Sequence, residues 1–344
     1  MKDDTFALMQ RLAPDLAQEI ERRALVLERI GALQPVGRRQ LAIRLNLPER
    51  EVRTVAALLK EHGLVSLDAA GMSLTPEADD ILPMARLFSR DLRGLTKLET
   101  KLTELFQVDK VCVVAGNADN DEHVLHEVGR NAAIRLRSFL QSGSTLAVTG
   151  GSTIHAVANA IPHSAPMNVM VVPARGGMGG SLETQANSVA SEMAKRLGGH
   201  HRLMHLPDEL DEQALNELRK LSEIDETLAL LERADVVLHG IGRADEMARK
   251  RQLPAAVENE VLRRGAVAEA YGCYFNAKGK MVYSASTVAH DLGALKPRCA
   301  LIAVAAGSSK AEAIAAVLRN RPHAMLVTDE GAAQAILAAH ETAC

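Results

Sequence analysis

The stretch Leu146–Ile161, LAVTGGSTIHAVANAI, decides the fold of the larger part of this chain. A short apolar run leads into two glycines and two hydroxyl residues, and apolar residues at helical spacing follow. A buried strand, a glycine turn and a helix in this order form the repeating unit of a helix-covered parallel sheet. The N–H groups of such a turn suit a phosphate group. The stretch therefore predicts an α/β fold with an anion-binding turn at Gly150, Gly151, Ser152 and Thr153.

The composition predicts a folded protein built mainly from aliphatic residues. Of the 344 residues, 47% are hydrophobic, but only 2% are aromatic and none is Trp. A core of this kind suits helices and buried parallel strands. It argues against a binder of single-stranded nucleic acid, which needs aromatic side chains for base stacking. The net charge of −3 excludes no partner, because a local basic patch can be offset elsewhere in the chain.

Neither a metal site, a cofactor nor a membrane segment is expected. The cysteines, Cys112, Cys273, Cys299 and Cys344, are scattered without a Cys-x-x-Cys pair, so neither zinc nor a disulfide framework is indicated. The N-terminal residues include early acids and no apolar signal segment, and no apolar run approaches about 18 residues. We therefore expect a cytoplasmic protein with reduced thiols.

The sequence pattern divides the chain into three parts. Residues 1–88 have mainly helical spacing, and residues 110–344 alternate between strands and helices. Residues 89–109 form a linker helix in which Leu95, Leu98, Leu102 and Leu105 follow the spacing of a coiled-coil seam. This stripe fits a dimerising helix and fits equally a helix that packs against its own domain.

The first part contains the pattern of a winged helix-turn-helix. Two short helices are predicted within PVGRRQLAIRLNLPEREVRTVAALLKEHGLV, residues 35–65, with Pro48 in the first turn of the second helix. The following residues, GLVSLDAAGMSLTPEA, alternate between apolar and polar on both sides of DAAG, as in a β-hairpin wing.

The charge of this segment favours DNA as its partner. Residues 34–60 hold six cations and two carboxylates, so the segment is positive by four. A recognition helix presents its first residues to base edges, which nominates Arg50, Glu51, Arg53 and Thr54. Arg38 and Arg39, at the start of the preceding helix, are expected near the phosphate backbone. The alternative is a winged helix that contacts protein, or an ordinary solvated cationic face.

The C-terminal part predicts a doubly wound, mostly parallel sheet. Seven apolar runs, most of them ending in glycine or a polar turn, read as strands: KVCVVAG, TLAVTG, NVMVVPA, RLMHLP, DVVLHGIG, CALIAVAAG and HAMLVTDEG. The segment YFNAKGKMVYSAS reads as an antiparallel hairpin. Ligands of such sheets collect at the carboxyl ends of the strands.

Three further turns place polar groups at that edge. AAGSSKAEAI opens a helix with Ser308 and Ser309 and adds the ammonium of Lys310. PARGGMGGSLETQAN sets Arg175 beside a glycine loop and is followed by Gln185. HGIGRADEMARKR ends in a cluster of cations. Two phosphate-like turns together with these cations suggest a ligand with an anion at each end.

The motifs VTGGSTI, VPARGGMG, QANSVA, HGIG, AVAEAYGCYFNAKG, AGSSKAEAI and VTDEGAA follow the helix-turn-helix in an order that resembles the central glycolytic genes regulators. These are a branch of the SorC-type sugar-sensing repressors, and the resemblance covers essentially the whole chain. It implies a tetrameric repressor of glycolytic genes whose effector domain resembles phosphosugar isomerases and deaminases. The implied inducer is fructose 1,6-bisphosphate.

The resemblance also implies ligand contacts by Ser152, Thr153, Arg175, Gln185, Lys250, Glu269 and Lys310. The carboxylate of Glu269 would accept hydrogen bonds from sugar hydroxyls. The sequence departs from the family where Lys250 stands in place of an arginine, because lysine cannot make a two-pronged contact with phosphate. That contact could pass to Arg249 or Arg251. Ser152 replaces a threonine and keeps the hydroxyl.

Two other classes of function remain as alternatives. A phosphosugar isomerase or deaminase with a fused DNA-binding module would need a general base, for which Asp329, Glu330, Glu269 or His239 could serve. No acid and base stand at recognisable spacing, so no catalytic residue is assigned. An architectural DNA-binding protein would leave Arg175 and Lys310 without a role. We expect a repressor that binds double-stranded operator DNA and a sugar bisphosphate and that self-associates as a dimer or tetramer.

Overall fold

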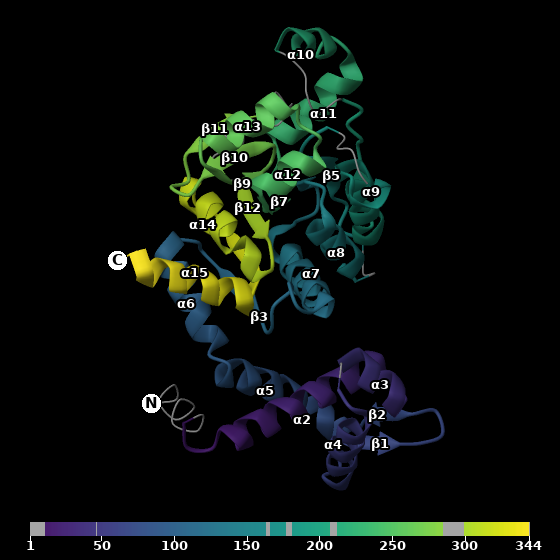
Figure 1. The fold of residues 1–344 in the computed structure, drawn as a ribbon. Helices are drawn as coiled ribbons and strands as arrows, with labels where there is room; N and C mark the ends of the chain where they lie inside the picture. The colour runs from purple at the N-terminus through teal and green to yellow at the C-terminus, as the bar shows by residue number, and fades with distance from the viewer. Residues whose placement is uncertain are drawn as a thin grey trace. The chain divides into compact units, whose positions relative to one another are not determined.

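The computed structural model describes residues 11–45, 47–162, 166–176, 181–206, 212–284 and 299–343. The chain divides into two compact units, Met1–Lys97 and Leu98–Cys344 (Figure 1). Each unit has its own apolar core. Among the described residues, no helix has the length and apolarity that a membrane crossing requires.

The N-terminal unit is a helical domain with a small β-hairpin, as the sequence predicts. Its elements are α2 (Pro14–Leu33), α3 (Arg38–Leu45), α4 (Glu49–Glu61), β1 (Val65–Leu67), β2 (Met72–Leu74) and α5 (Pro76–Leu92). The antiparallel strands pair Val65 with Leu74 and Leu67 with Met72. Helix α4 buries Val52 and Leu59 on its inner face, and its opposite face is polar and exposed.

The C-terminal unit is built on a seven-stranded parallel sheet in the order β3-β13-β12-β7-β4-β5-β6. The strands are β3 (Val111–Val114), β4 (Thr145–Val148), β5 (Met170–Pro173), β6 (His200–His201), β7 (Val236–Gly240), β12 (Ala300–Val304) and β13 (Met325–Asp329). Most of their residues are buried on both faces, which explains the continuous apolar runs in the sequence.

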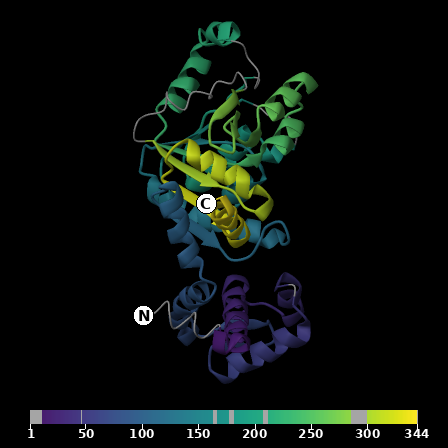
Figure 2. The same ribbon diagram turned by 60° about the vertical axis from the view of Figure 1, so that its left-hand side comes forward.

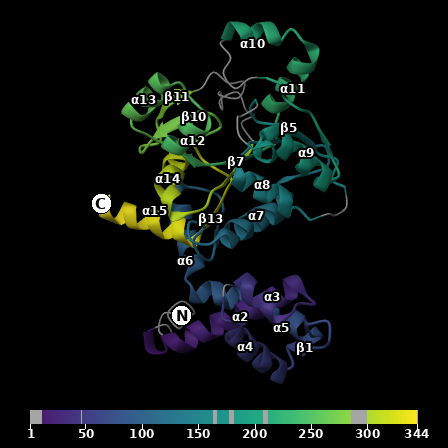
Figure 3. The ribbon, with the colours of Figure 1, turned by 45° about the vertical axis from the view of Figure 1, so that its right-hand side comes forward.

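Helices cover both faces of this sheet, which confirms the predicted doubly wound α/β class (Figures 1 and 3). One face carries α7 (Glu122–Leu136), α8 (Ser152–Ala160) and α9 (Ala186–Leu197), and the other carries α14 (Ala311–Asn320) and α15 (Glu330–Ala343). Helices α10 (Glu212–Leu218) and α11 (Ser222–Glu232) lead into β7, and short 3-10 turns η1 (Arg137–Phe139), η2 (Leu182–Thr184) and η4 (Ser308–Lys310) join other elements.

A second, antiparallel sheet has the order β11-β10-β9-β8. It consists of β8 (Gly242–Arg243), β9 (Ala266–Ala270), β10 (Cys273–Asn276) and β11 (Met281–Ser284), with α12 (Ala244–Lys250) and α13 (Ala255–Arg263) between β8 and β9. Strands β9 and β10 pack against α14 (Figure 2). The predicted hairpin is the pair β10 and β11, so that prediction is confirmed as far as Ser284.

One predicted strand is misplaced. RLMHLP was expected to form a strand, but pairing with β5 is limited to His200–His201 and one further bond from the N–H of Arg202 to the carbonyl of Val171. The chain leaves the sheet after that residue, and residues 203–206 adopt no regular structure. The apolar side chains of this segment instead pack beside α11, around a second cavity.

The leucine stripe of the linker lies on α6 (Leu95–Phe106). Leu95 and Leu102 are fully buried within the chain. From Leu98 onward the helix is tied to the C-terminal unit, since Glu99 accepts a hydrogen bond from the N–H of Val113 (2.7 Å). Two leucines of the stripe are thus buried within the chain, and dimerisation through this helix stays a prediction.

Candidate functional site

A cavity of about 300 Å³ opens at the carboxyl edge of the parallel sheet, next to the ends of β4, β5, β7 and β12. This is the place where ligands of doubly wound sheets bind. Eight of the ten residues predicted to bind the effector line it: Gly150, Gly151, Ser152, Thr153, Arg175, Lys250, Glu269 and Lys310.

The turn after β4 has the geometry that the glycine pair predicts. A Cβ atom on Gly150 would lie 2.5 Å from the carbonyl oxygen of Thr184, so no larger residue fits without a backbone shift. Gly151 has φ +113°, a backbone conformation that residues with a side chain rarely adopt. Its N–H donates a hydrogen bond to the same carbonyl oxygen (2.8 Å). Helix α8 begins at Ser152 without a side-chain cap. Its first N–H groups and the hydroxyls of Ser152 and Thr153 are therefore suited to an anion.

A buried cluster of two arginines and one carboxylate forms part of the cavity wall. Glu269 Oε1 accepts a hydrogen bond from Arg251 Nη2 (2.6 Å) and lies 3.7 Å from Arg175 Nη1. The N–H of Gly272 donates to the same oxygen (2.6 Å). Burial raises the pKa of Glu269, while Arg175 and the N–H of Gly272 oppose that shift. With Glu269 ionised, the cluster keeps one net positive charge.

Two ammonium groups increase the positive charge of the cavity. Lys250 ends α12, and Lys310 ends η4 just before α14. Burial, with the neighbouring ammonium of Lys250, lowers the pKa of Lys310. A ligand that brings negative charge would relieve this repulsion. The cavity is therefore suited to a polyanion.

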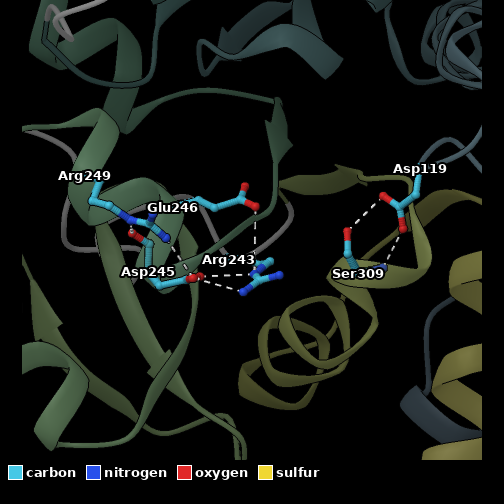
Figure 4. Close-up of polar contacts among 6 residues, drawn as sticks. All are labelled: Asp119, Arg243, Asp245, Glu246, Arg249 and Ser309. Atoms are coloured by element: carbon cyan, nitrogen blue, oxygen red, sulfur yellow. Dashed lines mark hydrogen bonds and ion pairs between the residues drawn. The ribbon is translucent and has the colours of Figure 1, made fainter.

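Gln185 and Ser309 are predicted ligand residues that do not line the cavity. Gln185 precedes α9 and lies between two lining residues, Thr184 and Ala186, but its own side chain is not among them. The hydroxyl of Ser309 donates to Asp119 Oδ1 (2.9 Å), and its N–H donates to Asp119 Oδ2 (2.8 Å) (Figure 4). Ser309 thus holds a carboxylate of this chain. The glycine loop 177–180 lies outside the described residues.

Of the two arginines that flank Lys250, only one reaches the cavity. Arg249 binds Asp245 through Nη2 and Oδ2 (3.0 Å), and its side chain is 64% exposed (Figure 4). Arg243 binds the same carboxylate from the other side (2.9 Å). Arg251 lines the cavity, and its side chain is only 7% exposed.

The cavity also includes residues that the sequence analysis did not nominate, such as Thr149, Thr184, Met247 and Tyr271. Tyr271 follows β9 directly and carries φ +57°, an unusual conformation for a residue with a side chain. Because Tyr271 lies beyond the end of β9 in this conformation, strand alternation could not have predicted its position.

Three of the four candidate bases of the alternative enzyme are held by hydrogen bonds within the protein, and the fourth, Glu269, lines the cavity. Asp329 accepts bonds from the N–H groups of Ala118 (2.7 Å) and Gly307 (2.9 Å). Glu330 accepts one from the N–H of Gly116 (3.0 Å). His239 is fully buried, and its Nδ1 lies 3.1 Å from the carbonyl oxygen of the next residue. These contacts assign the groups to the scaffold.

The predicted DNA-contacting residues lie on the outer faces of α3 and α4. Arg50, Arg53 and Thr54 share one exposed face of α4, opposite its buried residues. Neither Arg50 nor Arg53 forms an ion pair with another described residue. Arg38 and Arg39 begin α3 and are also exposed, although Arg39 Nε lies 3.4 Å from a carboxylate oxygen at the start of α4.

Glu51 differs from its neighbours in α4. Its Oε2 lies 3.6 Å from Arg22 Nε on α2, and the residue is half-buried. This ion pair joins α4 to α2, so Glu51 has a structural contact in addition to its predicted role at base edges.

Two family models match the chain, and the second of them includes nearly all of the linker helix. Residues 20–87 match the CggR N-terminal DNA binding domain. Residues 90–338 match a sugar-binding domain.

Proteins that are similar to this chain over nearly its whole length are transcriptional regulators. The central glycolytic genes regulator of Priestia megaterium is 39% identical over 332 residues, which cover 96% of this chain and 97% of that protein. The protein of the same name from Bacillus subtilis is 36% identical over 329 residues, with 95% and 97% covered.

The solved structures that resemble this chain are also those of transcriptional regulators. A SorC family transcriptional regulator from Enterococcus faecalis has a TM-score of 0.66 and 35% identity, covering 70% of this chain and 99% of that one. The full-length sorbitol operon regulator SorC from Klebsiella pneumoniae has a TM-score of 0.65 over 88% of this chain and 94% of its own, at 19% identity. These relatives confirm the expectation of a regulator over an enzyme. The chain belongs to the family of central glycolytic genes regulators and is a sugar-binding transcriptional regulator with an N-terminal DNA-binding domain.

Proposed function

We propose that this regulator represses glycolytic genes and that fructose 1,6-bisphosphate is its inducer. The observation that carries the proposal is the charge of the cavity. It gathers four cationic side chains, those of Arg175, Lys250, Arg251 and Lys310, against the carboxylates of Glu246 and Glu269. The N-terminus of α8 adds a further site for an anion.

The shape and the polar groups of the cavity favour a phosphorylated sugar over a simple anion. A volume of about 300 Å³ is at the small end of small-molecule sites. Hydroxyl and carboxylate groups such as those of Thr153 and Glu269 can exchange hydrogen bonds with sugar hydroxyls. The cations at separate positions suit a phosphate at each end of the sugar.

On the DNA side, we infer that α4 enters the major groove with Arg50, Glu51, Arg53 and Thr54 toward base edges, while Arg38 and Arg39 contact phosphates. A protein of this class reads paired half-sites as a symmetric assembly. We therefore infer a homodimer or homotetramer. Because operator DNA and sugar phosphates are both cytoplasmic in bacteria, we also infer that the regulator acts there.

The first test is thermal unfolding of the purified chain with fructose 1,6-bisphosphate, fructose 6-phosphate, glucose 6-phosphate and inorganic phosphate. A ligand that binds only the folded state raises the midpoint. A shift that is largest with the bisphosphate supports the proposal. Equal shifts with all four compounds would contradict it.

The second test concerns the link between effector and DNA. If the bisphosphate lowers operator affinity by some factor, operator DNA must lower bisphosphate affinity by the same factor. Fluorescence anisotropy of a labelled operator and calorimetric titration with and without operator measure the two factors. An operator affinity that the bisphosphate leaves unchanged would contradict the proposed linkage.

A further inference from the structure

The turn at residues 307–310 holds an anion that belongs to this chain, the carboxylate of Asp119. The N–H of Ser309 donates to Asp119 Oδ2 (2.8 Å), and the hydroxyl of Ser309 donates to Oδ1 (2.9 Å) (Figure 4). The hydroxyl of Ser308 donates to Oδ2 as well (2.9 Å). Backbone N–H groups at a helix start and hydroxyls beside them are also the donors that bind phosphate. Asp119 and a phosphate group therefore cannot use these donors at the same time.

The backbone of the turn allows a close approach by this carboxylate. Gly307 has φ +104°, and a Cβ atom on it would clash with Asp119 Oδ1. Burial alone would raise the pKa of Asp119, but the hydrogen bonds from Ser309 and Ser308 and the charge of Lys310 lower it. The side chain is therefore charged at neutral pH, as a phosphate group is.

The carboxylate of Asp119 can leave the turn while its loop stays in place. Asp119 is exposed, whereas the N–H of Ala118 donates to the fully buried carboxylate of Asp329 (2.7 Å). Asn117 Nδ2 donates to the hydroxyl of Ser308 (2.9 Å) and adds a second anchor. Rotation of the Asp119 side chain about its own bonds moves the carboxylate into solvent and keeps both anchors.

The turn adjoins the effector cavity through its last residue. Lys310 lines the cavity, but Ser309 does not. The sequence predicts both as ligand residues, and the contacts of Asp119 account for the difference, because the hydroxyl and the N–H of Ser309 are directed to that carboxylate.

We propose that Asp119 is an internal competitor of the effector, and that a phosphate of the effector displaces its carboxylate from Ser308 and Ser309. Binding then has to break the contacts of Asp119 first. A protein of which only a fraction is competent to bind has its apparent affinity reduced by that fraction. The competitor thereby raises the effector concentration at which the regulator responds. This inference rests on the proposed function, because it takes a phosphorylated effector to bind in the cavity beside the turn.

The test compares Asp119→Ala with the wild type by calorimetric titration of the full-length protein with fructose 1,6-bisphosphate, fructose 6-phosphate and inorganic phosphate. Removal of the competitor is expected to tighten bisphosphate binding about 5- to 30-fold, because the charge-assisted contacts no longer have to be broken. Asp119→Asn keeps the shape of the side chain without its charge and should lie between the two proteins. If Asp119 only supports the turn that positions Lys310, both variants bind more weakly than the wild type, and the proposal is overturned.

A matched control separates competition from a general gain of positive charge near the cavity. Glu312 is an exposed carboxylate in the first turn of α14, and it does not line the cavity. Glu312→Gln should stay within about twofold of the wild type, since charges in solvent are screened. Equal tightening in Glu312→Gln and Asp119→Ala would overturn the proposal. The melting temperature without added effector shows whether each variant has folded, and Asp119→Asn serves as the test if Asp119→Ala has not.

The same titrations distinguish this proposal from the proposed function. If the wild type binds the bisphosphate and Asp119→Ala binds it no more tightly, only the role of Asp119 is wrong. If the wild type prefers fructose 6-phosphate or inorganic phosphate and Asp119→Ala binds that compound more tightly still, the role of Asp119 stands and the named inducer is wrong. If none of the three compounds binds to either protein, both proposals are overturned.

Discussion

Lowering the pH from 7 to 5 is expected to destabilise the C-terminal unit through two buried histidines. His239 and His323 are almost completely buried, and their Nε2 atoms lie 3.1 Å apart. Nδ1 of His323 lies 2.9 Å from the carbonyl oxygen of Arg321. A carbonyl oxygen can only accept, so this Nδ1 carries the proton and Nε2 is bare in the neutral ring. His239 has the same arrangement with the carbonyl of Gly240 (3.1 Å), and the donor to the bare Nε2 atoms is the hydroxyl of Tyr271, 2.5 Å from that of His239 and 3.3 Å from that of His323.

Burial sets both pKa values below their ordinary range. It lowers the pKa of His323 to about 4, and burial together with the charge of His323 lowers the pKa of His239 well below 6.5. The unfolded chain therefore binds protons more readily than the folded chain. The stabilisation is complete above the unfolded pKa of about 6.5 and is lost as the pH falls toward 4. For His323 alone the loss between pH 7 and pH 5 is about 2 kcal/mol, at about 1.4 kcal/mol per pH unit.

Urea unfolding followed by tyrosine fluorescence measures this loss selectively. The chain has three tyrosines, Tyr271, Tyr274 and Tyr283, and no tryptophan, so the signal reports the C-terminal unit alone. In His323→Gln the free energy of unfolding should depend less on pH, even if the variant is less stable overall. The control is His126→Gln, an exposed position on α7 that should retain the wild-type slope. Parallel curves for wild type and His323→Gln between pH 7 and 5 would refute the reasoning.

Three substitutions test the other parts of the molecule. Arg53→Ala should weaken operator binding by about 1–3 kcal/mol and leave effector affinity unchanged, because the two sites lie in separate units. Anisotropy measures the operator affinity and calorimetry the effector affinity. A loss of both affinities would indicate misfolding. Lys310→Ala should do the converse, weakening effector binding roughly 10- to 100-fold through loss of a charge-assisted contact, with operator binding retained. Gly150→Ala places a Cβ 2.5 Å from the carbonyl oxygen of Thr184, so it should lower stability by about 1–3 kcal/mol and reduce effector affinity. An unchanged melting temperature and affinity in Gly150→Ala would show that the turn can move aside.

The fold could be predicted largely from sequence because its main signals are local. Buried parallel strands appear as short apolar runs, and α8 and its glycine turn appear at once in residues 146–161. The misplaced strand shows the limit of this logic. The edge strand β6 consists of two exposed histidines, whereas the apolar residues 203–206 pack beside α11. The apolar residues there therefore indicated a buried segment correctly, but they did not indicate pairing within the sheet.

Residue spacing alone predicts the geometry of the site only where that geometry is set within one local turn. Gly150 and Gly151 satisfy that condition, and the cavity contains both. The turn at Ser309 has the same local sequence features, yet the carboxylate that its N–H and hydroxyl bind comes from Asp119, 190 residues earlier. Hydrogen bonds from Ser309 and Ser308 outweigh the effect of burial and lower the pKa of Asp119, so that carboxylate remains an anion. A long-range contact of this kind leaves no trace in the spacing of residues along the chain.

The position of Arg251 shows how a family pattern and a structure can assign the same charge differently. The resemblance led us to expect a weaker phosphate contact at Lys250, because an ammonium lacks the fork of donors that an arginine has. By geometry, the next side chain is a buried guanidinium with spare donors at the same cavity. One residue of displacement along a helix rotates a side chain by about 100°, so neighbouring cations normally serve different surfaces. Here Lys250 is the last residue of α12 and Arg251 caps the helix, and both cations nevertheless line one cavity. A substitution at a binding position is therefore best judged together with its neighbours wherever a helix ends.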